Sequence, residues 1–109
     1  MEIRLADVEA RVEIAIRTVY SRYVFRVTEP KAGRGLLSGG RLGPKPRAAF
    51  LANTFLATNR YISKKDRLAI GYHAMFYLDG TGPDIITTSV ITDLGFAVSK
   101  PIDSSPEDC

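Results

Sequence analysis

The segment from Lys31 to Lys65 constrains the fold of this chain more than any other. It is strongly basic, and its two halves differ sharply in amino-acid composition. It carries eight basic residues and no acidic residue. Its first half, KAGRGLLSGGRLGPKPR, is rich in Gly and Pro, whereas its second half, AAFLANTFLATNRYISKK, is largely apolar. A fold for this chain must therefore place a basic, glycine-rich connection directly before an apolar element.

Glycine and proline make the first half of this segment unsuited to regular structure. Five glycines lie between Pro30 and Pro46, and glycine loses more backbone freedom on folding than any other residue. Leu36 and Leu37 offer apolar anchors to a core. We therefore predict a long Gly/Pro-rich basic loop over residues 31–47, and loops of this length in small domains are usually functional or disordered.

Apolar residues recur at helical spacing along most of the chain. In the N-terminal part they step three or four residues at a time, which is the period of one helix face. That stripe consists of Leu5, Val8, Val12, Ala15 and Val19. The predicted helices cover residues 7–22, 47–60, 64–78 and 84–98. The predicted fold class is mainly α, a small four-helix single domain with a long Gly/Pro-rich basic loop.

Residues near the expected helix ends support these boundaries. Asp7 suits the N-cap of the first helix, and Pro46 suits the first turn of the second. Ser63 to Asp66 has the form of a capping box at the start of the third. Val24 to Thr28 is predicted to be extended, because Arg26 alternates with apolar neighbours.

The last predicted helix has an alternative. Ile86, Val90 and Leu94 belong to a helical stripe, and Pro101 would stop a helix. However, seven of the eight residues in IITTSVIT are β-branched, which favours a strand. The alternative fold is α+β, with a C-terminal hairpin at residues 85–99 that turns at Asp93-Leu94-Gly95.

The inward faces of the four helices define a core within one domain, since 109 residues suit a single domain. We predict a globular domain over residues 1–102 and an acidic flexible tail over residues 103–109. The predicted core consists of Val8, Val12, Ile16, Val19, Leu51, Phe55, Leu68, Tyr72, Met75, Phe76, Ile86, Val90 and Leu94.

Charge is distributed unevenly along the chain. The formal net charge is about zero over residues 1–30, +8 over residues 31–78 and −5 over residues 79–109. The basic middle can either pair with the acidic C-terminal segment or contact an anionic partner.

The residues needed for common catalytic and metal sites are too few. His73 is the only histidine and Cys109 the only cysteine, so no Ser-His-Asp or Cys-His set can be assembled. The segment from Asp79 to Asp84 lacks the spaced oxygen ligands of a calcium loop. The segment from Gly33 to Ser38 lacks the last glycine of a dinucleotide-binding motif. We therefore expect no enzyme activity, no cofactor and no metal.

Surplus aromatic surface favours a protein-binding function. The chain carries more large aromatic side chains than one small monomer easily buries, and Tyr and Arg are enriched at interfaces. These aromatic residues include Phe50, Phe55, Tyr61, Tyr72, Phe76 and Tyr77. We expect a non-enzymatic protein-binding module, an adaptor or inhibitor of a larger protein, that forms a homodimer.

The residues predicted to contact a partner follow the basic segment. They are Arg34, Arg41, Lys45, Arg47, Tyr61, Lys64 and Lys65. The alternative function is a nucleic-acid-binding protein that uses the basic loop and a helix-turn-helix-like pair made by the second and third helices. In that hypothesis Lys64 and Lys65 begin the recognition helix and flank the loop.

A single cysteine excludes an internal disulfide, which suits a reducing compartment. The sequence shows no secretory signal pattern and no apolar run of about 18 residues. We therefore expect a protein of the cytoplasm, or of a host cell's cytoplasm, that does not enter a membrane.

Overall fold

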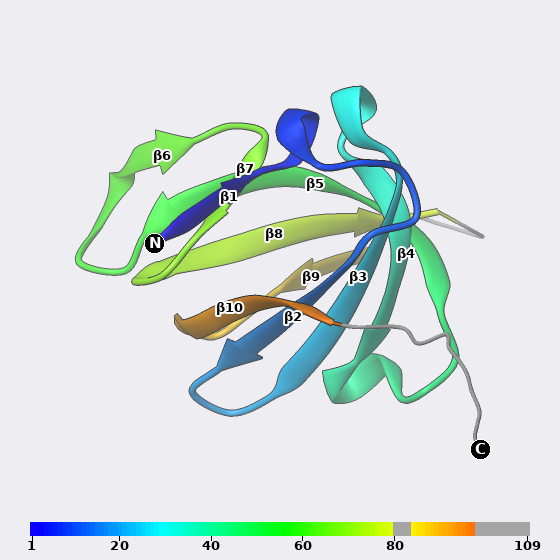
Figure 1. Ribbon diagram of the computed structural model, residues 1–109. Coiled ribbons are helices and arrows are strands. Elements are labelled where there is room, and N and C mark those ends of the chain that lie inside the picture. Colours follow the sequence, from blue (N-terminus) through cyan, green and yellow to red (C-terminus); the bar gives the residue numbers. More distant parts are fainter. Residues whose placement is uncertain (80–83, 98–109) are drawn as a thin grey trace, which may run out of the picture.

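The computed structural model describes residues 1–79 and 84–97, and these fold into antiparallel β-structure (Figure 1). The strands are β1 (Glu2–Arg4), β2 (Glu13–Thr18), β3 (Arg22–Glu29), β4 (Arg34–Gly39), β5 (Arg47–Leu56), β6 (Asn59–Lys64), β7 (Arg67–Ala69), β8 (Tyr72–Leu78), β9 (Asp84–Thr87) and β10 (Ile91–Ala97). Three short 3₁₀ turns connect them, η1 (Leu5–Asp7), η2 (Pro30–Ala32) and η3 (Gly40–Leu42). The described part of the chain contains no α-helix and no helix that could cross a membrane.

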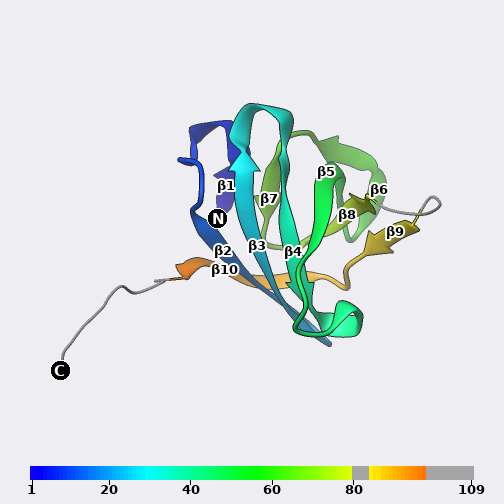
Figure 2. The same ribbon diagram turned by 90° about the vertical axis from the view of Figure 1, so that its right-hand side faces the viewer.

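Most strands belong to one sheet that rolls up on itself. Seven of its eight strands follow the order β10-β2-β3-β4-β5-β8-β9, and the eighth, β6, pairs with the far end of β5. Strands β9 and β10 lie at opposite ends of this order although only residues 88–90 separate them in the chain, so the sheet must curl until its ends meet (Figures 1 and 2). One backbone hydrogen bond across the closure runs from Gly71 N, just before β8, to Ile91 O at the start of β10, at 2.9 Å.

The core fills the inside of the rolled sheet. Alternate residues of strands such as β2, β3 and β8 point inward, and the rings of Phe25 and Phe76 meet with centroids 5.0 Å apart. The two-stranded β1–β7 sheet adds Ile3 and Leu68 to the same buried cluster, and η1 adds Leu5. Burying these large apolar side chains is the main favourable term in the stability of the fold.

The four helices predicted at residues 7–22, 47–60, 64–78 and 84–98 are wrong, and so is the mainly α, four-helix fold class. The stretch EIAIRT shows the reason, because Ile14 and Ile16 are buried whereas Ala15 and Arg17 are exposed. This alternation with period two is the pattern of a strand with one buried face. The predicted helical stripe through the same region combined residues of η1, of the segment that follows it, of β2 and of the β2–β3 turn.

The α+β alternative is wrong as a fold, although it placed strands in the correct region. Residues 84–87 and 91–97 are strands, but β9 pairs with β8 and β10 pairs with β2. The chain changes direction at residues 88–90, and Gly95 lies inside β10. The predicted hairpin turn at Asp93–Gly95 is therefore also wrong. The extended segment predicted at Val24–Thr28 is confirmed as part of β3.

The Gly/Pro-rich basic loop is wrong as well, because residues 34–39 form β4 in the middle of the sheet. Its glycines allow close approach between strands. A Cβ on Gly35 would lie 2.2 Å from the carbonyl oxygen of Arg26. Gly40 has φ +51° and lies against the ring of Tyr23. At these positions glycine allows close packing between strands and a left-handed backbone conformation, and it does not serve chain flexibility.

The predicted capping box at Ser63–Asp66 is instead the end of β6 followed by a bend at residues 65–66 before β7. Asp66 has φ +63°, which Asp tolerates better than most residues, and its carbonyl accepts a hydrogen bond from Leu5 N at 2.8 Å. Asp7 lies in η1 and provides no side-chain cap to an α-helix. The predicted tail at residues 103–109 and the stop at Pro101 lie outside the described residues.

The predicted core is partly correct. Six of the predicted positions are buried, namely Ile16, Leu51, Leu68, Phe76, Ile86 and Leu94. Six others are only partly buried, namely Val8, Val12, Phe55, Tyr72, Met75 and Val90. Val19 is 54% exposed because it lies in the β2–β3 turn.

Candidate protein-binding surface

The structure separates the residues predicted to bind a partner into two groups. Arg41 and Lys45 precede β5, whereas Tyr61, Lys64 and Lys65 follow it. A strand of ten residues spans roughly 30 Å, and Figure 1 shows η3 and β6 at opposite ends of the molecule. Lys64 and Lys65 therefore do not flank residues 31–47, as the sequence predicted.

Several of these cations already have acidic partners. Arg34 Nη1 lies 3.1 Å from Asp79 Oδ2, and Arg47 Nη2 lies 3.4 Å from Asp84 Oδ2. These side chains are substantially exposed to solvent, so each pair contributes little to stability. Their main effect is to hold the long arginine side chains in place on the surface.

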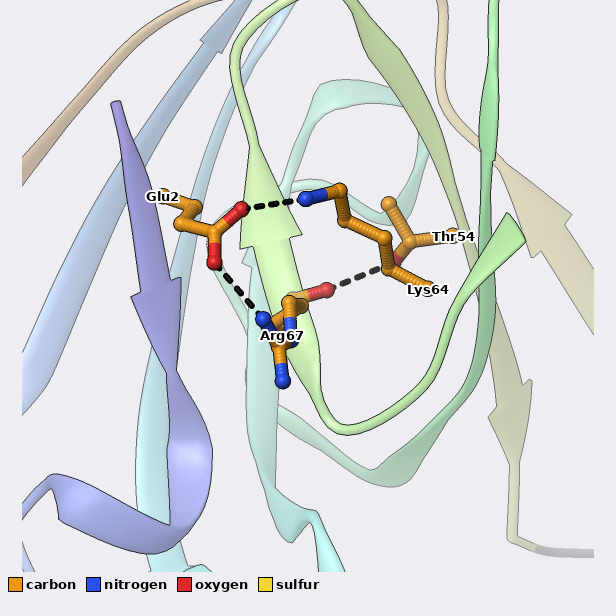
Figure 3. A network of polar contacts seen from close by, with 4 residues as sticks. All are labelled: Glu2, Thr54, Lys64 and Arg67. Atoms are coloured by element: carbon orange, nitrogen blue, oxygen red, sulfur yellow. Dashed lines mark hydrogen bonds and ion pairs between the residues drawn. The ribbon is translucent and has the colours of Figure 1, made fainter. Parts of the chain in front are cut away.

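Lys64 belongs to a polar network that closes the other end of the molecule (Figure 3). Its Nζ donates to Glu2 Oε1 at 2.7 Å, and Arg67 Nη1 donates to Glu2 Oε2 at 2.7 Å. Hydrogen bonds from Lys64 and Arg67 hold the pKa of Glu2 below its usual value. The hydroxyl of Thr54 donates to Arg67 O at 2.7 Å. This network joins β1, β5, β6 and β7, and we assign it a structural role.

A row of aromatic and aliphatic side chains crosses the outer face of the sheet. Phe50 of β5 lies opposite Arg34 of β4 on one side and Tyr77 of β8 on the other, and Tyr77 in turn lies opposite Ile85 of β9. In the next row Leu36 lies opposite Ala48. We call these residues the outer-face patch; they are Arg34, Leu36, Ala48, Phe50, Tyr77 and Ile85.

Contacts within the outer-face patch fix its side chains. The rings of Phe50 and Tyr77 meet edge to face with centroids 5.1 Å apart, a favourable aromatic geometry. The Arg34 guanidinium carbon lies 5.2 Å from the Phe50 ring centroid, within the range of a cation–π contact. Tyr77 is 41% exposed and Ile85 is 52% exposed. The patch therefore combines an ordered aromatic centre with apolar surface left in solvent.

The outer-face patch extends to an edge strand of the sheet. Among the described residues β9 pairs with β8 alone. Thr88 N donates to Ala74 O, and hydrogen-bonded pairs alternate along an antiparallel ladder. Ile85 and Thr87 therefore direct their backbone N–H and C=O groups away from β8. A partner can contact both the apolar patch and these backbone groups.

Sequence reasoning identified part of this surface. Phe50 and Tyr77 were among the surplus aromatic residues and Arg34 was a predicted contact residue, whereas Ile85 was not singled out. In YHAMFYL, Ala74, Phe76 and Leu78 are buried. Reading that stretch with period two would have placed Tyr77 on the outer face.

The described residues contain no group of three or more His, Cys, Asp or Glu side chains placed to hold a metal ion. The Nδ1 atom of His73 lies 2.8 Å from the carbonyl oxygen of Thr88, which requires a proton on Nδ1. The imidazole also stacks on Phe55 with centroids 5.1 Å apart. These contacts fit a histidine that packs β8 against neighbouring strands.

Comparisons with protein-family models, with curated proteins and with solved structures give no match to this chain. Its function is therefore inferred from the surface geometry described above.

Proposed function

We propose that the protein is a non-enzymatic binding module that recognises a larger protein through the outer-face patch. The observation that supports this proposal is the ordered row of Phe50, Tyr77 and Ile85, which stays partly exposed on the outside of the sheet. Aromatic residues and arginine carry much of the binding energy at protein interfaces. Because contacts within the patch already fix Arg34 and Tyr77, binding loses less side-chain entropy there.

The partner is proposed to offer an apolar surface bordered by polar groups. Arg34 and Asp79 form an ion pair beside the aromatic centre, and Arg47 and Asp84 form another beside β9. Such mixed charges at a rim favour correct orientation of the partner more than affinity. We further propose that the protein acts in the cytoplasm, because its single cysteine cannot form an internal disulfide.

The proposal is tested by capture experiments with surface variants. Immobilised wild-type protein is incubated with lysate of the source cells, and retained proteins are identified by mass spectrometry. We expect one protein to be retained by the wild type and lost with Ile85→Arg or Tyr77→Ser. The matched control is Tyr61→Ser, which removes a tyrosine that is 92% exposed on β6, far from the patch.

The proposal requires that retention of the partner protein from the lysate depends on the outer-face patch. A protein that binds Ile85→Arg as well as it binds the wild type would show that another surface is used. Loss of the same protein with Tyr61→Ser alone would move the interface to β6. Circular dichroism of each variant checks that the fold is intact.

A further inference from the structure

A second surface lies where the β2–β3 turn and η3 come together, at one end of the molecule (Figures 1 and 2). A Cβ on Gly39 would lie 2.3 Å from the carbonyl oxygen of Arg22, so the backbone before η3 packs directly on the start of β3. We call this surface the basic end; it consists of Arg17, Arg22, Arg41 and Lys45, all of which are exposed. Two of its residues, Arg41 and Lys45, were predicted contact residues.

Two arginines of the basic end are held close together by the strand register. Arg17 lies directly opposite Arg22 in the β2–β3 pair. Thr18 N donates to Ser21 O at 2.8 Å, so the neighbouring Arg17–Arg22 pair is of the non-hydrogen-bonded type. Cα atoms in such pairs are about 4.5 Å apart, and like charges placed opposite one another are destabilising. An anion bound between them would remove this repulsion.

The acidic side chain that the register places beside Arg17 forms no ion pair with it. Asp93 lies opposite Arg17 in the β10–β2 pair, yet its Oδ1 accepts a hydrogen bond from its neighbour Leu94 N at 3.0 Å. Among the described residues, no carboxylate oxygen lies within 4.0 Å of a basic-end nitrogen. By contrast, Arg34, Arg47, Lys64 and Arg67 each have an acidic partner.

An exposed aromatic side chain stands beside these cations. Tyr20 is 85% exposed at the tip of the β2–β3 turn. The turn is nevertheless held in place, because Tyr20 N donates to Ser89 Oγ at 3.2 Å and Val19 N donates to Val90 O at 3.0 Å. A tyrosine on a fixed turn next to these arginines provides a stacking surface together with phosphate-binding groups.

We propose that the basic end binds single-stranded nucleic acid. Arg17 and Arg22 bind one backbone phosphate between them, Arg41 and Lys45 contact neighbouring phosphates, and Tyr20 stacks on an unpaired base. A single strand is favoured over a duplex because only an unpaired base can place its face on Tyr20. The helix-turn-helix of the sequence hypothesis plays no part here, since the described residues contain no α-helix. The inference does not depend on the outer-face patch.

Fluorescence anisotropy with a short fluorescein-labelled oligothymidylate tests the proposal across a range of salt concentrations. For the double variant Arg17→Ala/Arg22→Ala we expect weaker binding and a log–log salt slope that is smaller by about 0.7 for each phosphate that the variant no longer neutralises. For Tyr20→Ser we expect a loss of roughly 5- to 150-fold, the effect of removing one stacked base. The charge-matched control Arg60→Ala/Lys65→Ala and the control Tyr61→Ser should bind like the wild type.

Several outcomes would overturn the proposal. These are the absence of binding at low salt, an equal loss in the charge-matched control, and equally tight binding of duplex DNA. Competition by poly-glutamate as effective as that by unlabelled oligothymidylate would assign the surface to an acidic protein instead. Ultraviolet crosslinking of the wild-type protein gives an independent reading that needs no variant. The crosslinked peptide should contain Tyr20, and crosslinks confined to Tyr61 would contradict the proposal.

Discussion

At the scale of single residues, the stability of this protein depends on where small side chains allow strands to approach. Gly35 and Gly95 both lie within strands, but their surroundings differ. The position of a Cβ on Gly35 is already occupied by the backbone of Arg26, whereas nothing lies within 4 Å of a Cβ on Gly95. The two glycines therefore provide a matched pair of substitutions.

Gly35→Ala should destabilise the protein, because the added methyl group would lie 2.2 Å from the carbonyl oxygen of Arg26 and 3.0 Å from the Phe25 ring. Overpacking of this kind costs about 1–3 kcal/mol, and each kcal/mol lowers Tm by roughly 4–8 °C in a domain of this size. Gly95→Ala should leave Tm unchanged or raise it slightly. Thermal denaturation followed by circular dichroism measures both, and an unchanged Tm for Gly35→Ala would contradict the expected clash.

Glu2 should make stability depend on pH in the acidic range. Its pKa is lowered in the folded protein by hydrogen bonds from Lys64 and Arg67, so ionised Glu2 stabilises the fold above its ordinary pKa of 4.5. This contribution is lost as the pH falls through the lowered pKa. The Tm difference between wild type and Glu2→Gln should therefore be present at neutral pH and disappear in strong acid. A difference that persists undiminished there would exclude this linkage.

At the scale of elements, the strands differ in how many neighbours hold them. β3 pairs with β2 on one side and β4 on the other, and its inward residues Tyr23, Phe25 and Val27 are buried. β6 pairs with β5 at three positions, with a register shift between Phe55 and Leu56, and five of its six residues are exposed. Local opening is easiest where buried contacts and backbone pairing are fewest.

Hydrogen exchange should follow this difference. The amides of residues 60–62 in β6 should exchange long before those of residues 23–27 in β3, because the β6 segment can open without disturbing the core. Exchange followed by mass spectrometry of peptic peptides resolves the two segments. Equal protection of both would mean that β6 is held by contacts with a second molecule.

At the scale of the whole molecule, the predicted homodimer remains a prediction, and the outer-face patch gives it a specific location. A symmetric pair that covers Tyr77 and Ile85 would remove apolar surface from water. Without another partner, we expect light scattering to give twice the 12.0 kDa mass of one chain. The variant Ile85→Arg should shift the mass to that of the monomer. A monomer mass for the wild type at micromolar concentration would contradict the dimer.

The sequence by itself determined the charge segments and about a third of the buried core, six of its eighteen buried hydrophobic residues. It also identified the extended segment at Val24–Thr28, because alternation within one strand is local information. It did not determine the fold, because short apolar runs such as YHAMFYL fit a helix face and a strand equally well when read alone. Antiparallel pairing between strands distant in sequence decided between them, since it satisfies the backbone hydrogen bonds and buries one face of each strand.

The functional surfaces depend on tertiary structure for the same reason. Arg17 and Arg22 are separated by a turn, and only the β2–β3 register places them opposite one another. Phe50, Tyr77 and Ile85 come from three strands and form one row only because β5, β8 and β9 are neighbours. The sequence specifies the type of each side chain, whereas strand order and register determine which side chains lie on the same surface.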